Sequence, residues 1–155
     1  MRAAYFSLGS NLGDRATYLR DAVQVVADND PYRLSSIYET ESVGGVDQAV
    51  FWNAVLEVVT AASPLELLAR AHRAEVAAQR TRDVRWGPRT LDVDVLLVGD
   101  ESWNDAALTV PHPRMWERRF VLVPLAELAP TLVAEDVVAA ATGAVHRLGT
   151  LDTLR

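Results

Sequence analysis

The spacing of apolar and polar residues divides most of the chain into strands and helices of ordinary length. The strand-like runs cover residues 3–8, 33–40, 51–59 and 91–98. A helix with apolar residues at helical spacing follows Asp14, whose side chain suits an N-cap. A second helix is predicted to begin at the capping box Ser63-Pro64-Leu65-Glu66 and to run to about Arg80.

This order of elements is strand, helix, strand, strand, helix, strand. It predicts an α+β, ferredoxin-like fold (βαββαβ), with a four-stranded antiparallel sheet and both helices on one face. The other face would accept a ligand and the C-terminal additions. A short packing helix is predicted from Phe120 to Leu128, and beyond Thr131 the sequence predicts only packing. The 155 residues and 50% hydrophobic content favour one domain over residues 1–155.

Two carboxylates interrupt the apolar strand predicted over residues 91–98. Because side chains alternate along a strand, Asp92 and Asp94 share one face, about 7 Å apart, while Val93 and Val95 take the other. Unpaired carboxylates in an apolar strand are costly to desolvate, so magnesium or arginine is expected to meet them. The structural alternative is an edge strand whose two acids are simply exposed to water.

A group of arginines precedes these acids, and the Gly87-Pro88 turn keeps the group next to the strand. Its members are Arg80, Arg82, Arg85 and Arg89. Arginine binds phosphate oxygens in a bidentate manner, and magnesium bridges phosphates to carboxylates. We therefore predict a metal-nucleotide site.

Two other polar patterns admit both a functional and a structural interpretation. Phe51 and Asn53 share one face of their strand, where they could stack on a flat heteroaromatic ligand and recognise its edge. Alternatively, Asn53 only bonds the backbone. His72, Glu75 and Gln79 form one stripe of the second predicted helix, either for a ligand or as a solvated face.

Composition and charge exclude several classes of protein. The net charge of −6 argues against a protein that coats nucleic acid through bulk electrostatic attraction. The chain has no cysteine, and His112 lies between two prolines with no second histidine nearby, which favours a structural role over a zinc site. No basic leader or membrane-length apolar stretch is present. We expect a cytoplasmic monomer with neither nucleic acid nor membrane as partner.

Three motifs in order carry a family resemblance: residues 7–14 (SLGSNLGD), residues 85–94 (RWGPRTLDVD) and residues 108–120. With them the chain resembles the 6-hydroxymethyl-7,8-dihydropterin pyrophosphokinases of folate biosynthesis from about residue 3 to residue 130. The resemblance implies transfer of the terminal diphosphate of ATP to the hydroxymethyl group of the pterin, with release of AMP. ATP and the pterin would be the partners.

The resemblance also implies roles for individual residues. Asp92 and Asp94 would bind two magnesium ions, and Arg80 and Arg89 would stabilise the charge of the transferred diphosphate. Contacts to the nucleotide would come from His72, Glu75, Arg82, Trp86, Arg89, Thr109, His112 and Arg118. Contacts to the pterin would come from Thr40, Val43, Phe51, Asn53, Trp86 and Phe120.

Some positions depart from the family pattern. Glu41, Gln79 and Ala107 replace residues that are common in the family, which leaves the loop conformation and the ATP affinity open. Two alternatives also stay open on the residues alone. One is another magnesium-dependent nucleotidyl- or phosphotransferase, and the other is a non-catalytic ferredoxin-like ligand-binding module.

Overall fold

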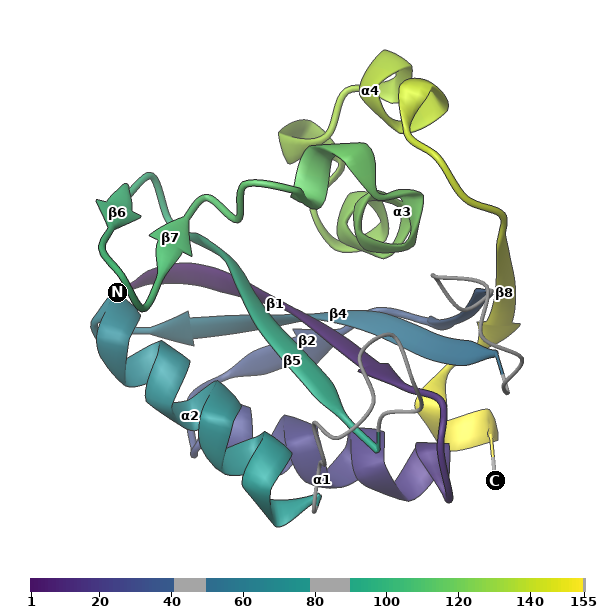
Figure 1. Ribbon diagram of the computed structural model, residues 1–155, viewed down its shortest axis with the longest axis horizontal. Helices are drawn as coiled ribbons and strands as arrows, with labels where there is room; N and C mark the ends of the chain where they lie inside the picture. The colour runs from purple at the N-terminus through teal and green to yellow at the C-terminus, as the bar shows by residue number, and fades with distance from the viewer. Residues whose placement is uncertain (41–49, 79–89, 155) are drawn as a thin grey trace.

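One antiparallel sheet organises the chain, with helices on both of its faces (Figure 1). The structure is a computed structural model that describes residues 1–40, 50–78 and 90–154. Within these ranges the sheet has six strands: β1 (Arg2–Ser10), β2 (Tyr32–Leu34), β3 (Ile37–Thr40), β4 (Phe51–Thr60), β5 (Asp92–Val98) and β8 (Val145–Gly149). Their order is β5-β1-β4-β3-β8, with β2 paired to β4.

The helices α1 (Arg15–Ala27) and α2 (Pro64–Ala77) cover one face of this sheet. Both begin where the sequence predicts, since Asp14 accepts the Thr17 amide at 3.1 Å and Ser63 accepts the Glu66 amide at 3.2 Å. The predicted end of the second helix near Arg80 lies outside the described residues. No helix in the described part of the chain is long and apolar enough to span a bilayer.

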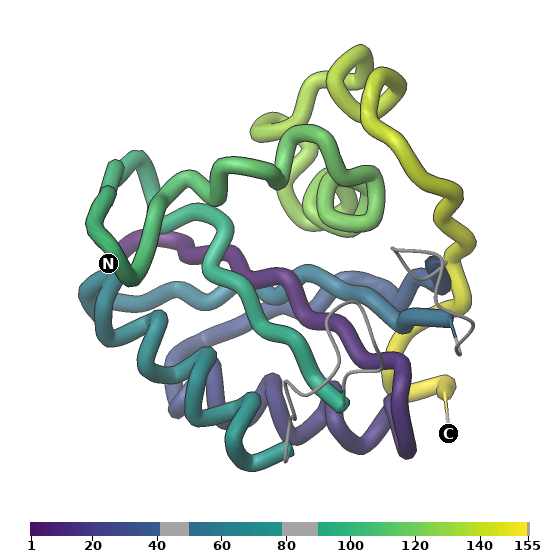
Figure 2. Tube along the Cα trace, viewed as in Figure 1, coloured from purple at the N-terminus to yellow at the C-terminus, as the bar shows by residue number. Residues whose placement is uncertain are grey.

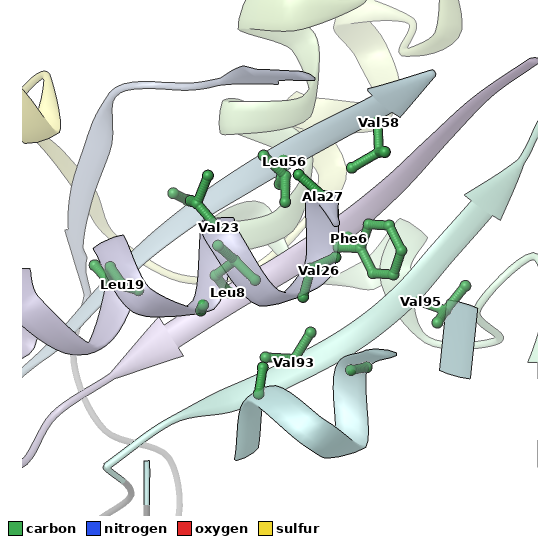
Figure 3. Packing of buried hydrophobic residues seen from close by; sticks show 14 of the residues in the cluster. Phe6, Leu8, Leu19, Val23, Val26, Ala27, Leu56, Val58, Val93 and Val95 are labelled. Carbon is green, nitrogen blue, oxygen red and sulfur yellow. The ribbon is translucent and has the colours of Figure 1, made fainter. Parts of the chain in front are cut away.

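Apolar side chains from three strands fill the layer beneath α1 and α2 (Figure 3). The strand side chains are Phe6, Leu8, Leu56, Val58, Val93 and Val95, and they pack with Leu19, Val23 and Val26 of α1. Complete burial of one such side chain contributes about 1.5–3 kcal/mol. This layer therefore determines which residues of each strand face the helices and which face the opposite side.

The opposite face is covered in part by α3 (Arg119–Leu128), which confirms the helix predicted over 120–128. A second cluster forms there from Tyr5, Val55, Leu96, Met115, Val121, Leu122 and Leu125. The remaining elements are β6 (Trp103–Asn104), β7 (Thr109–Val110), α4 (Glu135–Ala140) and the 3-10 helices Met115–Glu117, Pro130–Leu132 and Leu151–Thr153.

The predicted single strand over residues 33–40 is wrong, because it is interrupted between β2 and β3. Ser35 exchanges two hydrogen bonds with Val55 of β4, using its backbone N and its side-chain Oγ, each at 2.9 Å. The Ser36 amide instead donates to the carboxylate of Glu127 on α3, at 2.9 Å. Side-chain groups thus replace part of the strand ladder at this point.

The expectation of four strands is also wrong, because β8 adds a strand along β3. Figure 2 shows the C-terminal segment passing from α4 along this edge of the sheet toward α1. There the Arg20 guanidinium donates to the carbonyls of Leu151 and Leu154, at 2.9 and 2.8 Å. The mixed exposure of residues 145–149 explains why an alternating pattern did not predict this strand.

Glu57 is a buried carboxylate on the α3 face of β4. It accepts two hydrogen bonds from Arg33, at 2.8 and 2.7 Å, and one from the Tyr5 hydroxyl at 2.7 Å. The bonds from Arg33 lower the pKa of Glu57. Burial, together with the bond to Glu57, raises the pKa of Tyr5 to about 12.

We predict that Glu57→Gln lowers the free energy of unfolding by about 1–3 kcal/mol at neutral pH, because the charged acceptor is lost. A depressed native pKa stabilises the fold above the unfolded value of 4.5, and this contribution is lost as pH falls through the native pKa. The deficit should therefore shrink in urea titrations at about pH 3 relative to pH 7. The exposed Glu135→Gln is the control, and an equal deficit at both pH values would contradict the prediction.

Candidate active site

Asp92 and Asp94 lie on the face of the sheet opposite to α1 and α2. Val93 and Val95 are anchored in the layer beneath those helices, so alternation turns the two acids the other way, as predicted. Asp92 is half-buried and Asp94 is exposed. Because β5 is an edge strand, the exposure of Asp94 does not by itself indicate a binding site. The residues around the acid pair distinguish a binding site from an edge that is simply exposed to water.

The two acids line a cleft of about 410 Å³, which is in the size range of small-molecule sites. The cleft lies between α2, β5 and the segment that contains β7. It brings together these predicted residues: His72, Glu75, Asp92, Asp94, Thr109 and His112. The candidate nucleotide contacts from three separate parts of the chain are therefore adjacent, which a solvated edge strand would not require.

Glu75 connects α2 to the outer edge of β5. Its side chain is buried, and its carboxylate accepts the Val93 amide at 3.0 Å. Val93 lies between the two acids in sequence, so this bond fixes the backbone that carries both of them. The interpretation of Glu75 as part of a solvated helix face is therefore wrong.

Asp105 is a cleft residue that the sequence analysis missed. Its carboxylate accepts hydrogen bonds from the Trp103 ring nitrogen and from the amides of Ala107 and Leu108, at 2.8, 2.7 and 2.8 Å. These bonds lower the pKa of Asp105 and fix the turn that leads into Thr109. The sequence did contain one sign of this role. Asp105 stands two residues before Ala107 and three before Leu108, and an aspartate commonly accepts such amides in a turn.

His112 and Arg118 lie close enough to the acid pair for their charges to interact with it. Burial lowers the pKa of His112, while the charge of Asp94 acts in the opposite direction. Burial also lowers the pKa of Arg118, and the charges of Asp94 and Asp92 oppose this shift. An arginine remains protonated nonetheless, so a partly buried cation lies within the field of the two carboxylates. Its guanidinium is 5.7 Å from the centroid of the Phe120 ring.

Strand register places a second group of predicted residues on the same face. Gly9 of β1 pairs with Asp92 on one side and with Asn53 on the other, so the three lie in one row across the sheet. The Asn53 amide donates to the Thr40 hydroxyl at 2.6 Å, and both side chains are buried. Within the described residues, the recorded partner of the Asn53 amide is thus a side chain. Phe51 precedes it on the same face of β4.

Two parts of the predicted site lie outside the described residues. They contain Val43 in residues 41–49, and Arg80, Arg82, Arg85, Trp86 and Arg89 in residues 79–89. In the remaining residues, no group of three or more His, Asp or Glu side chains could hold a metal ion. A pair of carboxylates on one strand face still fits Mg²⁺, which proteins commonly bind through one or two carboxylates together with substrate phosphates.

We predict that Thr40→Val lowers the free energy of unfolding by about 1–3 kcal/mol, because it leaves the buried amide of Asn53 without its acceptor. Urea denaturation measures this loss. Thr40→Ser keeps the hydroxyl and should retain most of the stability. Equal stability of the two variants would mean that the bond contributes nothing.

Comparison with known proteins places this geometry in a family context. Residues 5–130 match the family described as 7,8-dihydro-6-hydroxymethylpterin-pyrophosphokinase (HPPK). The 2-amino-4-hydroxy-6-hydroxymethyldihydropteridine pyrophosphokinase of Bacillus subtilis is 50% identical over 85% of this chain and 81% of its own length. The enzyme of the same name from Methylorubrum extorquens is 43% identical over 86% of each chain.

One longer relative and one longer solved structure match this chain over part of their length. The bifunctional protein FolKE of Lactococcus lactis subsp. cremoris is 40% identical over 83% of this chain, which spans 38% of FolKE. A crystal structure of Plasmodium falciparum HPPK-DHPS superimposes with a TM-score of 0.57 at 14% identity, over 99% of this chain and 43% of that one. At that level of identity the superposition shows a common fold.

Proposed function

The chain belongs to the 7,8-dihydro-6-hydroxymethylpterin-pyrophosphokinase family, and we propose that its reaction takes place on the α3 face of the sheet, between β5 and β4. Membership makes the protein an ATP-dependent diphosphotransferase of folate biosynthesis. It moves diphosphate from ATP to the hydroxymethyl group of the dihydropterin. AMP is the other product, because it is what remains of ATP. The observation that carries the location is the row Asp92, Gly9, Asn53.

Asp92 and Asp94 are the residues that would hold magnesium, which the family uses, and we assign two ions to the pair. Bound there, magnesium would neutralise charge on the phosphates of ATP. Asp94 lines the cleft, and the buried Val93 and Val95 hold the strand in the orientation that keeps it there. The acids therefore fix where the triphosphate lies along β5.

The nucleotide would contact the cleft residues His72, Glu75, Thr109 and His112, together with Arg118. Thr109 follows the turn that Asp105 holds, so its position is determined locally. Arg118 contributes a partly buried positive charge toward the acids. Contacts from Arg80, Arg82, Trp86 and Arg89 complete the proposed nucleotide site, and they rest on the family resemblance of the sequence alone.

The pterin would lie over β4, with Asn53 recognising its edge and with Phe51 and Phe120 as the stacking partners. Thr40 holds the Asn53 amide through its hydroxyl, so the remaining oxygen of Asn53 has a fixed direction. Val43 and Trp86 would wall the pterin, as the family resemblance implies. A buried amide held in this way favours a ligand whose edge offers complementary donors and acceptors.

The reaction needs positioning more than it needs a nucleophilic side chain. A hydroxymethyl group attacks a phosphorus atom only when it is held close and in line with the leaving group. Neighbouring strands lie about 4.8 Å apart, so Asp92 and Asn53, two strands apart, have backbones about 10 Å from each other. A pterin held at Asn53 can thus reach a phosphate held at Asp92.

The finer features of the fold are also part of the proposal. The order β5-β1-β4-β3, with α1 and α2 on one face, agrees with a ferredoxin-like core to which β8 is added. We propose that residues 1–155 form a single catalytic domain. We further propose that it acts as a cytoplasmic monomer on small molecules and without nucleic acid, in keeping with the net charge of −6.

Release of AMP from MgATP in the presence of the hydroxymethyl dihydropterin tests the assignment of the acids. We predict that Asp94→Ala lowers this rate by about 100-fold or more, because the phosphates lose a metal-binding carboxylate. Circular dichroism should remain native, since Asp94 is exposed.

The matched control is Asp100→Ala, an exposed aspartate beyond the other end of β5, which should keep the parent rate. Omission of the pterin should abolish AMP release in every variant. Retained AMP release by Asp94→Ala would refute the role of the pair in binding the metal.

A further inference from the structure

Gly9 occupies the centre of the row that joins the two halves of the proposed site. It is buried at the C-terminal end of β1, between Asp92 of β5 and Asn53 of β4. It has no side chain on the face where the pterin and the phosphates would meet. Asp92 and Asn53, on its two sides, have proposed roles in binding the metal and the pterin, whereas Gly9 has none.

The space at Gly9 is already occupied by Asn53. A Cβ atom at this position would lie 2.7 Å from Oδ1 of Asn53 and 3.6 Å from Cδ1 of Phe51. The contact with Phe51 would be ordinary, whereas the contact with Asn53 is too short for real Cβ atoms. Among the described residues, the side chain that a methyl group at position 9 would displace is therefore that of Asn53.

Asn53 cannot move aside without cost. Its amide is bonded to Thr40 at 2.6 Å, and its side chain is 4% exposed. The backbone of Gly9 itself imposes no restriction, because it pairs regularly on both sides and is not one of the glycines with positive φ. Alanine would thus suit β1, and the obstacle to it is the position of the Asn53 side chain.

We propose that Gly9 is a positioning residue for pterin recognition: the absence of a side chain there allows Asn53 to keep its bond to Thr40 and its place beside the pterin. This inference rests on the proposed pterin site over β4. It requires that the effect of a side chain at position 9 reach the pterin through Asn53. The two residues should then be energetically coupled, which a general structural role of Gly9 would not require.

A double-mutant cycle tests this coupling. Binding of 6-hydroxymethyl-7,8-dihydropterin is measured by calorimetry, in the presence of Mg²⁺ and a non-hydrolysable ATP analogue, for the parent, Gly9→Ala, Asn53→Ala and the double variant. We expect Gly9→Ala to raise the Kd of the pterin about 10- to 100-fold in the parent background and less than about twofold in the Asn53→Ala background. The Kd of the ATP analogue should change less than about twofold.

The control is Ser10→Ala, which alters the neighbouring buried residue of β1, on the opposite face of the strand, and should leave pterin binding unchanged. If Gly9→Ala fails to fold, the double variant should recover a cooperative unfolding transition, because the clashing atom is gone. Failure to recover it would contradict the inference.

The outcomes separate this inference from the proposed function. Unchanged pterin binding in Asn53→Ala would refute the pterin site over β4, and the role of Gly9 with it. Weakened binding in Asn53→Ala but not in Gly9→Ala would overturn only the role of Gly9. An equal effect of Gly9→Ala in both backgrounds would do the same.

Discussion

The cost of burying a carboxylate is the constraint on which this structure depends. Along β5, Val93 and Val95 enter the layer beneath α1 and α2, and the period of two then directs Asp92 and Asp94 to the other face. A register slip by one residue would bury both acids and expose both valines. Each buried charge would lose hydration that no partner in the apolar layer could replace. The positions of the acids are thus set by the core behind them.

The same face of the sheet serves two purposes along its length. Near the beginning of β1 it is covered by α3, and Tyr5 packs there with Val55 and Leu96, next to the hydrogen-bonded Glu57. Near the end of β1 it becomes polar, with Gly9 and the row that crosses it. A register shift between β1 and β5 occurs between Tyr5 and Phe6, within the part of the face that α3 covers. Such irregularities change which side chains reach a face and commonly lie near functional sites.

Hydrogen bonds through Glu127 connect the helix that carries Phe120 to the strand that carries Thr40. Its carboxylate on α3 accepts the Ser36 amide at 2.9 Å and the Tyr38 hydroxyl at 2.6 Å. Tyr38 pairs directly with Asn53 in the sheet. The two sides of the proposed pterin site are thereby held by one network, and displacement of α3 would leave a carboxylate and a hydroxyl unpaired.

The sequence by itself determined where the helices start, which side chains of β4 and β5 share a face of the sheet, and the family. These features depend on neighbouring residues: a cap acts three residues away, alternation acts two residues away, and a motif is contiguous. It did not predict β8, the break at Ser35 or the role of Asp105, and it identified Gly9 only as part of the motif over residues 7–14. Each of these depends on groups distant in the chain. Only the tertiary structure could bring Asp92, Gly9 and Asn53 into one row, because strand order and register are decided by packing of the whole sheet and not by any one segment.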